Sequence, residues 1–570
     1  MPKPSLQQLL QAAVSQHQAG NLAEAEQLYH QALEQDPNQP DALNLLGVIA
    51  QHKGDLGQAL ALFDRAIAAA PTLAVIPFNK GNALRDAGQH QDALTAYEAA
   101  LNCDPRFQDA LLNLGVLLQE EGQIKPALEH FNTLVQINSG HHKAHYNIGK
   151  CFQAAGNIDK ALSAFQTALG LNSNDHDAHF AIANVYADMT RYDDAIDHIK
   201  TAINLKPNWA EAHTNLGNYL SDIDRHEDAL PFFDRANELE PNNPNARVNR
   251  GLTLLTLGRL KEGWQDFSER AQSDAPFYKT FKGDTPRWRG ESITTKRILV
   301  WNEQALGEEI LFSSLLRELS KASGHCTLVC APKLKTVFTR SFADVTNLQI
   351  TDQPDRDINV AEFDVQCSLV DLGQIFRPHL TEFPDAQPYL AWDETLRSDL
   401  RALLEERFGA DQKFIGISWA SANPLIGDRK SVSLRDWKPL LSIPGVIFVN
   451  VQYGSAANDV TALPQEFQDK IATVDLVNLN GDLNETLALL AAMDEVITCS
   501  NTTAHLAGAA GLSTSVLVPS GRARIWYWFS EGSQSPWYAN VGLARQNTDG
   551  RWDAAWSTLS KRIQQSVAAP

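Results

Sequence analysis

The residues of this sequence that are best suited to bind a ligand form a polar turn, Ser500-Asn501-Thr502-Thr503. The turn follows a predicted strand over 496–499 and opens a predicted helix over 504–510, which carries His505. Hydroxyls, amides and free backbone N–H groups at a helix start can bind phosphate, and the helix dipole favours negative charge there. The alternative is an ordinary N-cap, since most helices begin with such residues. Four consecutive polar residues followed by a rare histidine favour the ligand-binding interpretation.

Alternating strands and helices must position this turn. We predict strands over 298–301, 326–329, 363–367, 414–419, 446–451, 496–499 and 516–518. Helices are predicted over 308–319, 394–407, 434–441 (capped by Ser433), 485–493 and 504–510. This alternation predicts two tandem Rossmann-like units with parallel sheets, whose ligands bind at the carboxyl ends of the strands. Ser418 and Gln452, at the ends of two strands, are therefore predicted to contact the same ligand.

The common nucleotide-binding fingerprints are missing from these units. No GxxxxGK[ST] loop and no GxGxxG follows any of the predicted strands. Glycine-rich loops are thus not expected to bind the phosphate. The hydroxyls and amides of the 500–503 turn are expected to do so instead.

Residues 6–270 repeat with a period of 34. One register holds a small residue, at Gly47, Gly81, Gly115, Gly149, Ala183, Gly217 and Gly251. A second register holds Ala25, Ala59, Ala93, Ala127, Ala161, Ala195 and Ala229. Proline closes five units, and an aromatic residue recurs in the second half of most units. Because a small residue lets helices approach closely and proline stops a helix, the pattern predicts stacked pairs of antiparallel helices. It resembles the tetratricopeptide repeat, with an atypical eighth unit at 244–270 where Gly263 and Trp264 indicate contact with another domain.

An asparagine stands two places before the small residue in five units. These residues, which we call the asparagine ladder, are Asn79, Asn113, Asn147, Asn215 and Asn249. A side-chain amide both donates and accepts hydrogen bonds, so it can bind the backbone of an extended peptide without reading its side chains. The alternative is that each amide only bonds a neighbouring helix or faces water. The regular spacing favours a peptide-binding face, and the ladder resembles the one in the repeats of eukaryotic O-GlcNAc transferase, which holds protein substrates.

The second half of the chain resembles glycosyltransferases of the GT-B fold. The stretch from Ser500 to Gly511 looks like their donor-binding turn, closest to the heptosyltransferase-like branch that bacteria fuse to tetratricopeptide arrays. The resemblance spans about 297–546. Ser500 stands where an acidic residue often starts the turn, so the sequence does not fix the donor. The segment Gly307-Glu308-Glu309-Ile310 resembles the Gly-Asp-x-Ile segment of the family.

The resemblance assigns roles to individual residues. Glu308 would be the catalytic base, Lys430 would neutralise donor phosphate, and His505 would assist catalysis. Two of them have a plainer alternative: Glu308 as a first-turn carboxylate that interacts with the helix dipole, and Lys430 as a solvated surface charge. Together the two residues favour a catalytic site, because a base must take the proton of the acceptor hydroxyl and a cation must stabilise the phosphate that leaves as an anion.

Composition excludes several other functions. The chain has 570 residues and a net charge of −20, which argues against a nucleic-acid or anionic-membrane binder. No run of about 20 apolar residues and no secretory signal is found, so we predict a cytoplasmic protein without a transmembrane segment. Six scattered cysteines form no disulfide framework and no CxxC pair, and Cys326 and Cys330, four apart in an apolar run, indicate buried free thiols. Asp355-Arg356-Asp357 imitates a metal-binding DxD motif but lies in a polar loop, so no metal is expected.

The sequence thus predicts a helical tetratricopeptide superhelix over 1–271, a connector over 272–296, and a GT-B-type pair of Rossmann-like domains over 297–408 and 409–570. Family resemblance implies a metal-independent protein O-glycosyltransferase without a cofactor that modifies Ser or Thr of a protein held by the repeats. It further implies flagellin as acceptor and a CMP-activated nonulosonic acid as donor, with a UDP-sugar as second choice. Two alternatives stay open: a glycan or lipid-core transferase docked by its repeats, and a non-catalytic repeat scaffold.

Overall fold

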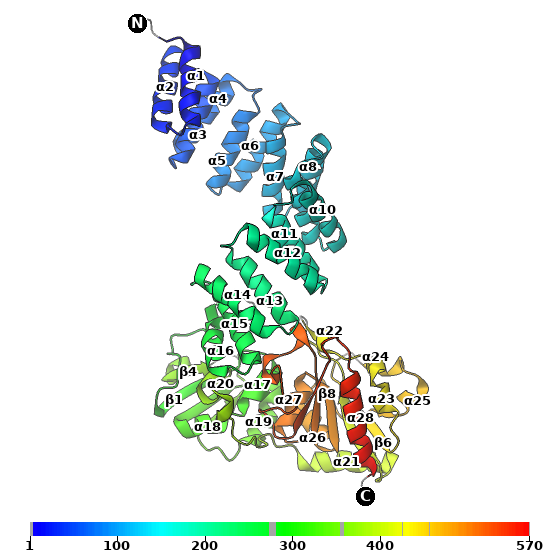
Figure 1. The fold of residues 1–570 in the computed structure, drawn as a ribbon. Helices are drawn as coiled ribbons and strands as arrows, with labels where there is room; N and C mark the ends of the chain where they lie inside the picture. Colours follow the sequence, from blue (N-terminus) through cyan, green and yellow to red (C-terminus); the bar gives the residue numbers. More distant parts are fainter. Residues whose placement is uncertain (1–3, 273–280, 354–357, 424–425, 455–456, 569–570) are drawn as a thin grey trace. The chain divides into compact units, whose positions relative to one another are not determined.

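The computed structural model forms two compact units, Met1–Pro207 and Asn208–Pro570, which are described separately (Figure 1). It describes residues 4–568 apart from 273–280, 354–357, 424–425 and 455–456. The DxD-like sequence at 355–357 therefore lies outside the described residues. So does part of the predicted connector.

Helices alone build residues 6–267, as the period of 34 predicts. The first unit holds α1 (Leu6–Gln18), α2 (Leu22–Gln35), α3 (Pro40–His52), α4 (Leu56–Ala69), α5 (Val75–Asp86), α6 (His90–Cys103), α7 (Gln108–Glu120), α8 (Ile124–Ile137), α9 (His142–Ala154), α10 (Ile158–Leu171), α11 (His176–Asp188) and α12 (Tyr192–Leu205). The second unit begins with α13 (Ala210–Asp222), α14 (His226–Leu239), α15 (Pro244–Thr256) and α16 (Leu260–Phe267). Each odd-numbered helix packs on the helix that follows it. The chain therefore contains helix–turn–helix repeats of the tetratricopeptide kind.

In five repeats the small residue lies under the aromatic ring of the same repeat. At Gly115 of α7, an added Cβ would come within 2.6 Å of the Phe131 ring of α8. The corresponding distances at Gly47, Gly81, Gly149 and Gly217 are 2.5–2.7 Å. The ring thus fills the space inside a repeat, between its two helices. Where Ala183 replaces the glycine, the buried residue in the aromatic register is the smaller Ile199.

A four-stranded parallel sheet follows the repeats. Its strands are β1 (Ile293–Trp301), β2 (Ser323–Val329), β3 (Leu348–Thr351) and β4 (Val365–Ser368), in the order β3-β2-β1-β4. Its helices are α17 (Leu306–Ser313), α18 (Leu316–Ala322), α19 (Lys335–Ser341) and α20 (Asp371–Phe376). The next helix, α21 (Glu394–Phe408), packs on α26 (Leu483–Ala491), which belongs to the second sheet. The single helix predicted over 308–319 is therefore two helices, which separate at Ser314 and Leu315.

A six-stranded parallel sheet completes the chain. Its strands are β5 (Lys413–Ser418), β6 (Val446–Asn450), β7 (Ile471–Ala472), β8 (Glu495–Cys499), β9 (Thr514–Val518) and β10 (Val541–Arg545), in the order β10-β9-β8-β5-β6-β7. Its helices are α22 (Gly427–Lys430), α23 (Lys438–Leu441), α24 (Ala457–Thr461), α25 (Gln465–Gln468), α26 (Leu483–Ala491), α27 (Thr502–Ala509) and α28 (Asp553–Ala568). The predicted Ser433 cap is wrong: residues 434–437 form a 3₁₀ turn, and Ser433 makes no side-chain capping bond.

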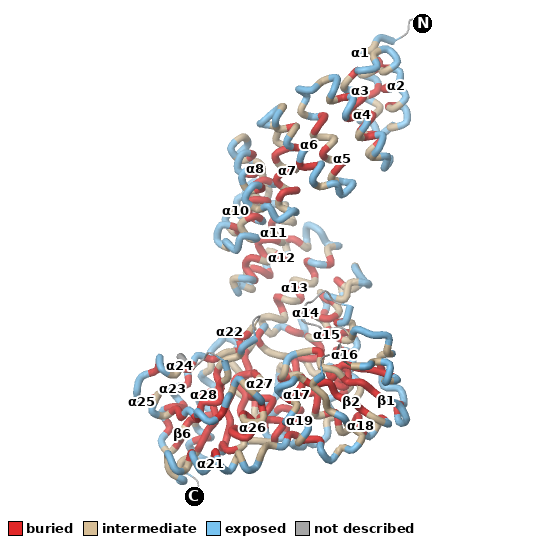
Figure 2. Tube along the Cα trace, turned by 180° about the vertical axis from the view of Figure 1, so that it is seen from behind, coloured by how far each residue is buried: buried red, intermediate tan, exposed pale blue. Residues whose placement is uncertain are grey.

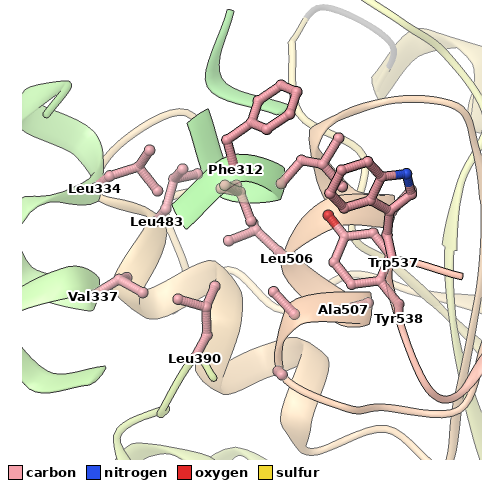
Figure 3. Packing of buried hydrophobic residues seen from close by; sticks show 14 of the residues in the cluster. Phe312, Leu334, Val337, Leu390, Leu483, Leu506, Ala507, Trp537 and Tyr538 are labelled. Carbon is pink, nitrogen blue, oxygen red and sulfur yellow. The ribbon is translucent and has the colours of Figure 1, made fainter. Parts of the chain in front are cut away.

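One hydrophobic core joins the two sheets. Phe312 of α17 and Leu506 of α27 belong to it, as do Val337 of α19 and Leu483 of α26 (Figure 3). Figure 2 shows the buried residues concentrated on the strands and on α26 and α27, while exposed residues gather on outer helices and turns. Five of the six cysteines are buried, and all are free, as predicted.

The last repeat packs on the α/β region, as Gly263 and Trp264 indicate. Trp264 of α16 is buried against Phe312 and Trp526, and its Nε1 donates a hydrogen bond of 2.9 Å to the Arg377 carbonyl. Just after α16, the buried Arg270 donates to both carboxylate oxygens of Glu303, each at 2.7 Å, and to Asp371 at 2.8 Å. Since Glu303 lies in the loop from β1 to α17, this ion cluster fixes the approach to α17.

We expect Gly115→Ala to destabilise the array by about 1–3 kcal/mol, because the new methyl group must displace the Phe131 ring. Gly170→Ala is the matched control. An added Cβ there meets nothing within 4 Å, so the better helix propensity of alanine should stabilise by up to about 1 kcal/mol. Urea denaturation followed by circular dichroism measures both. Equal effects at the two sites would contradict the packing described above.

Candidate functional site

In both sheets, the residues predicted to act on the donor follow the strands next to the point where strand order reverses. In the six-stranded sheet, β5 pairs with β6 on one side and with β8 on the other. After β5 the chain adds β6 and β7 on one side, and it then adds β8, β9 and β10 on the other side. In parallel sheets, ligands usually bind in the crevice at such a reversal of strand order. β5 ends at Ser418 and β8 at Cys499, one residue before the polar turn. In the four-stranded sheet, β1 stands at the equivalent point between β2 and β4, and its loop leads to Glu308.

The polar turn is built largely from bonds within the protein. Asn501 is the N-cap of α27 and accepts a 3.0 Å hydrogen bond from the Thr503 N–H. Its Nδ2 donates to Ser418 Oγ at 2.8 Å. The Ser500 hydroxyl is buried and accepts from Trp528 Nε1 at 2.8 Å. Thr503 is 1 % exposed, so Thr502 is the residue of the turn that keeps partial solvent contact.

Gln452 connects this turn to the loop after β5. Its Oε1 accepts hydrogen bonds from Ser418 Oγ at 2.9 Å and from the backbone N–H groups of Trp419 and Ala420 at 2.9 and 2.8 Å. Ser418, Gln452 and Asn501 thus form one buried network that holds the loop in place. Direct donor binding by these side chains stays a prediction, because their polar groups already have protein partners.

Glu308 and Lys430 lie on helices that follow strands of different sheets, and the charge of each shifts the pKa of the other. Lys430, the last residue of α22, is only 7 % exposed, and burial lowers its pKa while the charge of Glu308 opposes that shift. Burial raises the pKa of Glu308, against the opposing effects of Lys430 and of a 3.3 Å hydrogen bond donated by the Tyr527 hydroxyl. A carboxylate of raised pKa, held near one buried cation, is a suitable general base.

His505 lies next to this pair and is fully buried. Burial, aided by the charge of Lys430, lowers its pKa to about 3, so the imidazole is neutral at physiological pH. Its Nδ1 lies 2.8 Å from the Tyr538 hydroxyl and its Nε2 lies 3.2 Å from the Tyr527 hydroxyl. A neutral imidazole with two protein partners orients the tyrosines, and it carries no charge to offer a leaving phosphate. His505 thus holds the two tyrosines in place, and its catalytic role stays a prediction.

The sequence interpretation missed an aromatic segment over 526–529, whose signal was its composition, Trp526-Tyr527-Trp528-Phe529. This segment supplies Tyr527 to Glu308 and Trp528 to Ser500. Arg545 at the end of β10 holds it by donating to four backbone carbonyls, those of residues 528, 529, 531 and 532.

The asparagine ladder makes different bonds at different repeats. Asn79 donates to Asn44 Oδ1 of the preceding repeat at 3.0 Å, and Asn113 donates to Asn82 Oδ1 at 2.9 Å. Asn147 is 8 % exposed and bonds the Lys143 carbonyl of its own helix. Part of the plainer alternative is thus correct for these three residues. Because an amide carries two N–H donors and an acceptor, Asn79 and Asn113 keep further capacity for a ligand.

The other two ladder residues, Asn215 and Asn249, lie in the second unit. Both are partly buried, on α13 and α15 respectively.

A possible metal-ligating group in the described residues, Asp175-His176-Asp177, lies far along the chain from the α/β region. Asp175 caps α11 by accepting from the N–H groups of Asp177 and Ala178, each at 3.1 Å. The capping role of Asp175 explains why an acidic residue stands at this position.

Comparison with known families identifies the repeats. The tetratricopeptide-repeat family matches residues 10–74 and 180–244, and a second TPR-repeat family matches residues 81–122. The family described as anaphase-promoting complex, cyclosome, subunit 3 matches residues 120–202. All of these matches lie within the helical array.

A curated relative extends the similarity. The chain is 30 % identical over 333 residues to Protein FlbA of Caulobacter vibrioides, covering 55 % of this chain and 54 % of that protein. The chain thus spans about half the length of the curated relative it matches.

Several solved structures are similar to part of this chain. They include MamA (27 % identity, TM-score 0.27, 30 % of this chain and 92 % of that chain) and YrrB, described as a TPR protein with an unusual peptide-binding site (23 % identity, TM-score 0.29, 32 % and 95 %). A tetratricopeptide repeat protein from Parabacteroides merdae also matches, with 21 % identity, a TM-score of 0.36, and 44 % and 98 % coverage. Within the described residues, no helix is both long and apolar enough to cross a membrane.

The buried, neutral His505 predicts a defined loss of stability in acid. Its pKa is lower in the folded than in the unfolded chain, where it is about 6.5. The unfolded state therefore binds more protons between pH 3 and 6.5, so stability is lost as the pH falls through that window. One such group contributes about 1.4 kcal/mol per pH unit. We expect His505→Gln to reduce the stability lost between pH 6.5 and 5 by about 2 kcal/mol.

Urea unfolding followed by tryptophan fluorescence tests this, since ten of the twelve tryptophans follow residue 280. His379→Gln, which removes an exposed imidazole, is the control. A His505→Gln protein with the acid sensitivity of the wild type would contradict the neutral assignment.

Proposed function

We propose that this protein is a glycosyltransferase that moves a sugar from a nucleotide-activated donor to a hydroxyl group of a protein bound by its repeats. The observation that carries the proposal is that the charges of Glu308 and Lys430 act on each other. Glu308 lies in α17 and Lys430 in α22, the helices that follow the strands at which strand order reverses in the two sheets. A base and a buried cation at one site are the two charges that such a transfer requires.

The chemistry follows from these two groups. The acceptor hydroxyl attacks the anomeric carbon of the sugar and transfers its proton to Glu308. The bond between that carbon and the donor phosphate oxygen breaks, and the electron pair leaves with the phosphate. Lys430, together with the positive end of the α27 helix dipole, stabilises this anion. Thr502 is the side chain of the polar turn best placed to contact the phosphate, because it keeps solvent contact.

The repeats would bind the protein acceptor. In this proposal the asparagine ladder contacts its backbone, which makes capture independent of the acceptor's side chains. Flagellin as the acceptor, a CMP-activated nonulosonic acid or a UDP-sugar as the donor, a metal-independent reaction and a cytoplasmic location all belong to this proposal. They rest on the family resemblance of the sequence.

A second candidate is a non-catalytic repeat scaffold, and one observation favours it. Ser500, Asn501 and Thr503 are buried, and each has a protein hydrogen-bond partner at this turn. In this second candidate, the turn is the remnant of a donor site whose polar groups now bond only the protein. The two candidates differ in whether the protein binds a nucleotide.

Thermal unfolding of the full chain with CMP, UDP, GDP and ADP separates these candidates. A bound nucleotide at 100 times its Kd stabilises the folded state by about 2.7 kcal/mol. We expect one nucleotide to raise the Tm, and the shift to be lost in Lys430→Ala and reduced in Thr502→Ala. Lys438→Ala, at an exposed lysine of α23, is the matched control and should keep the shift. If no nucleotide raises the Tm of the folded wild type, the scaffold is the correct reading.

The ladder predicts a separate effect on the acceptor. We expect Asn79→Ala with Asn113→Ala to raise the KM for a protein acceptor about 5–10-fold per amide, the loss of one hydrogen bond each, and to leave the nucleotide-induced Tm shift unchanged. Asn102→Ala, at an exposed position of the second helix of its repeat, should change neither. An unchanged KM in the double variant would refute acceptor binding by the ladder.

A further inference from the structure

Every repeat turns between its two helices through a residue in the left-handed conformation. In six repeats this residue is a glycine with φ between 72° and 82°, at Gly20, Gly54, Gly88, Gly122, Gly156 and Gly258. The same register of 34 places Thr190 and Asp224 in the other two, with φ of 60° and 64°. Side chains other than glycine are less stable in this conformation, although aspartate adopts it more readily than most.

The side chain of Asp224 accepts hydrogen bonds at both carboxylate oxygens. Its Oδ1 accepts a 3.0 Å hydrogen bond from the Gly521 N–H, and its Oδ2 accepts one of 3.1 Å from Arg524 Nη2. The side chains of Asp224 and Arg524 are 17 % and 8 % exposed. Burial alone would raise the pKa of Asp224, but His226, whose Nε2 lies 3.5 Å from Asp224 Oδ1, and the charge of Arg524 hold it below its usual range. Without this carboxylate, a nearly buried guanidinium would lose its counter-charge.

The residue that donates its N–H to Asp224, Gly521, is also in the left-handed conformation. Gly521 has a φ of 60°, and an added Cβ would lie 2.2 Å from the Asp222 carbonyl oxygen at the end of α13. No side chain fits at that distance. Asp224 at a glycine position and Gly521 at a position that excludes any side chain therefore face each other, and we call this pair with Arg524 the turn contact.

Along the chain, Arg524 of the turn contact precedes Tyr527 of the candidate active site by three residues. Arg524 is followed at once by the segment that carries Tyr527 and Trp528, which bond Glu308 and Ser500. A further bond, from the Ser530 N–H to the Thr256 carbonyl of α15 at 2.8 Å, ties the end of this segment to the last repeats. The segment is thus fixed to the repeats at both ends.

We propose that Asp224 is a positioning residue: through Gly521 and Arg524 it fixes the 521–530 segment to the repeats and thereby sets the hydrogen bond from Tyr527 to Glu308. This inference rests on the proposed function for its catalytic consequence. It gives the repeats a second role, because the geometry around the base depends on the turn between α13 and α14.

Hydrogen exchange measured by mass spectrometry tests the contact without any assay of activity. In Asp224→Gly, which restores the glycine of six other repeats and relieves the backbone, we expect the amides of 521–529 to exchange about tenfold faster. Thr190→Gly makes the same exchange of a left-handed residue for glycine in the α11–α12 turn and should leave these amides unchanged. Asp224→Asn keeps the side-chain shape and removes the charge, and it decides the matter if Asp224→Gly does not fold. Wild-type exchange at 521–529 in the folded variant would overturn the proposal.

The pH profile of kcat supplies a readout that a merely structural role would not move. The groups that influence Glu308 are Lys430, Tyr527 and Tyr538. A weaker bond from Tyr527 stabilises the ionised carboxylate less, so the acidic limb of the profile should move to higher pH in Asp224→Asn and stay in place in Thr190→Gly. An unmoved limb would overturn the catalytic consequence. A wild type without transfer activity would refute the proposed function alone, and hydrogen exchange would still decide the turn contact.

Discussion

The close approach of α17 and α27 is the contact on which the candidate site depends. An added Cβ at Gly307 would lie 2.8 Å from Cδ2 of His505, so only glycine allows the two helices to meet at this distance. Glu308 follows Gly307 directly, and His505 holds the tyrosine that bonds Glu308. One small residue therefore brings the two strand-order reversals together, and the buried core around Phe312 and Leu506 keeps them there.

Burial then determines which groups at the site can carry charge. His505, inside the core, is held neutral, whereas Glu308 and Lys430 shift toward neutrality and offset part of each other's shift. An isolated buried charge is costly, and a paired one less so. The site thus contains one acid–base pair whose proton affinity responds to small changes in its neighbours, above all in the Tyr527 hydroxyl. That sensitivity is what makes the position of the 521–530 segment important.

The sequence predicted elements well wherever a pattern repeats or a strand is fully apolar. The period of 34 located the helical array, and the strands predicted at 414–419 and 496–499 were placed within one residue. The strand predicted at 298–301 ends where β1 ends, but β1 begins five residues earlier, at Ile293. Local rules failed where tertiary packing decides: the break at Ser314 and the 3₁₀ turn after Ser433 have no distinct local signal. At the site, Glu308 and Lys430 were found by resemblance. Tyr527 was missed and Tyr538 was given no role, because their partners are distant in the sequence and become visible only in three dimensions.

Departures from a repeat pattern carry information that the pattern itself does not. Glycine at the left-handed turn position serves the backbone alone, so its replacement by Asp224 requires another cause, and the bonds to Gly521 and Arg524 provide it. The same argument applies to Trp264, which breaks its own register and packs on the α/β region. Thr190 departs equally, but it is exposed, and nothing in the structure explains it. In a repeat array, a register break with buried partners therefore marks where the array joins its functional neighbour.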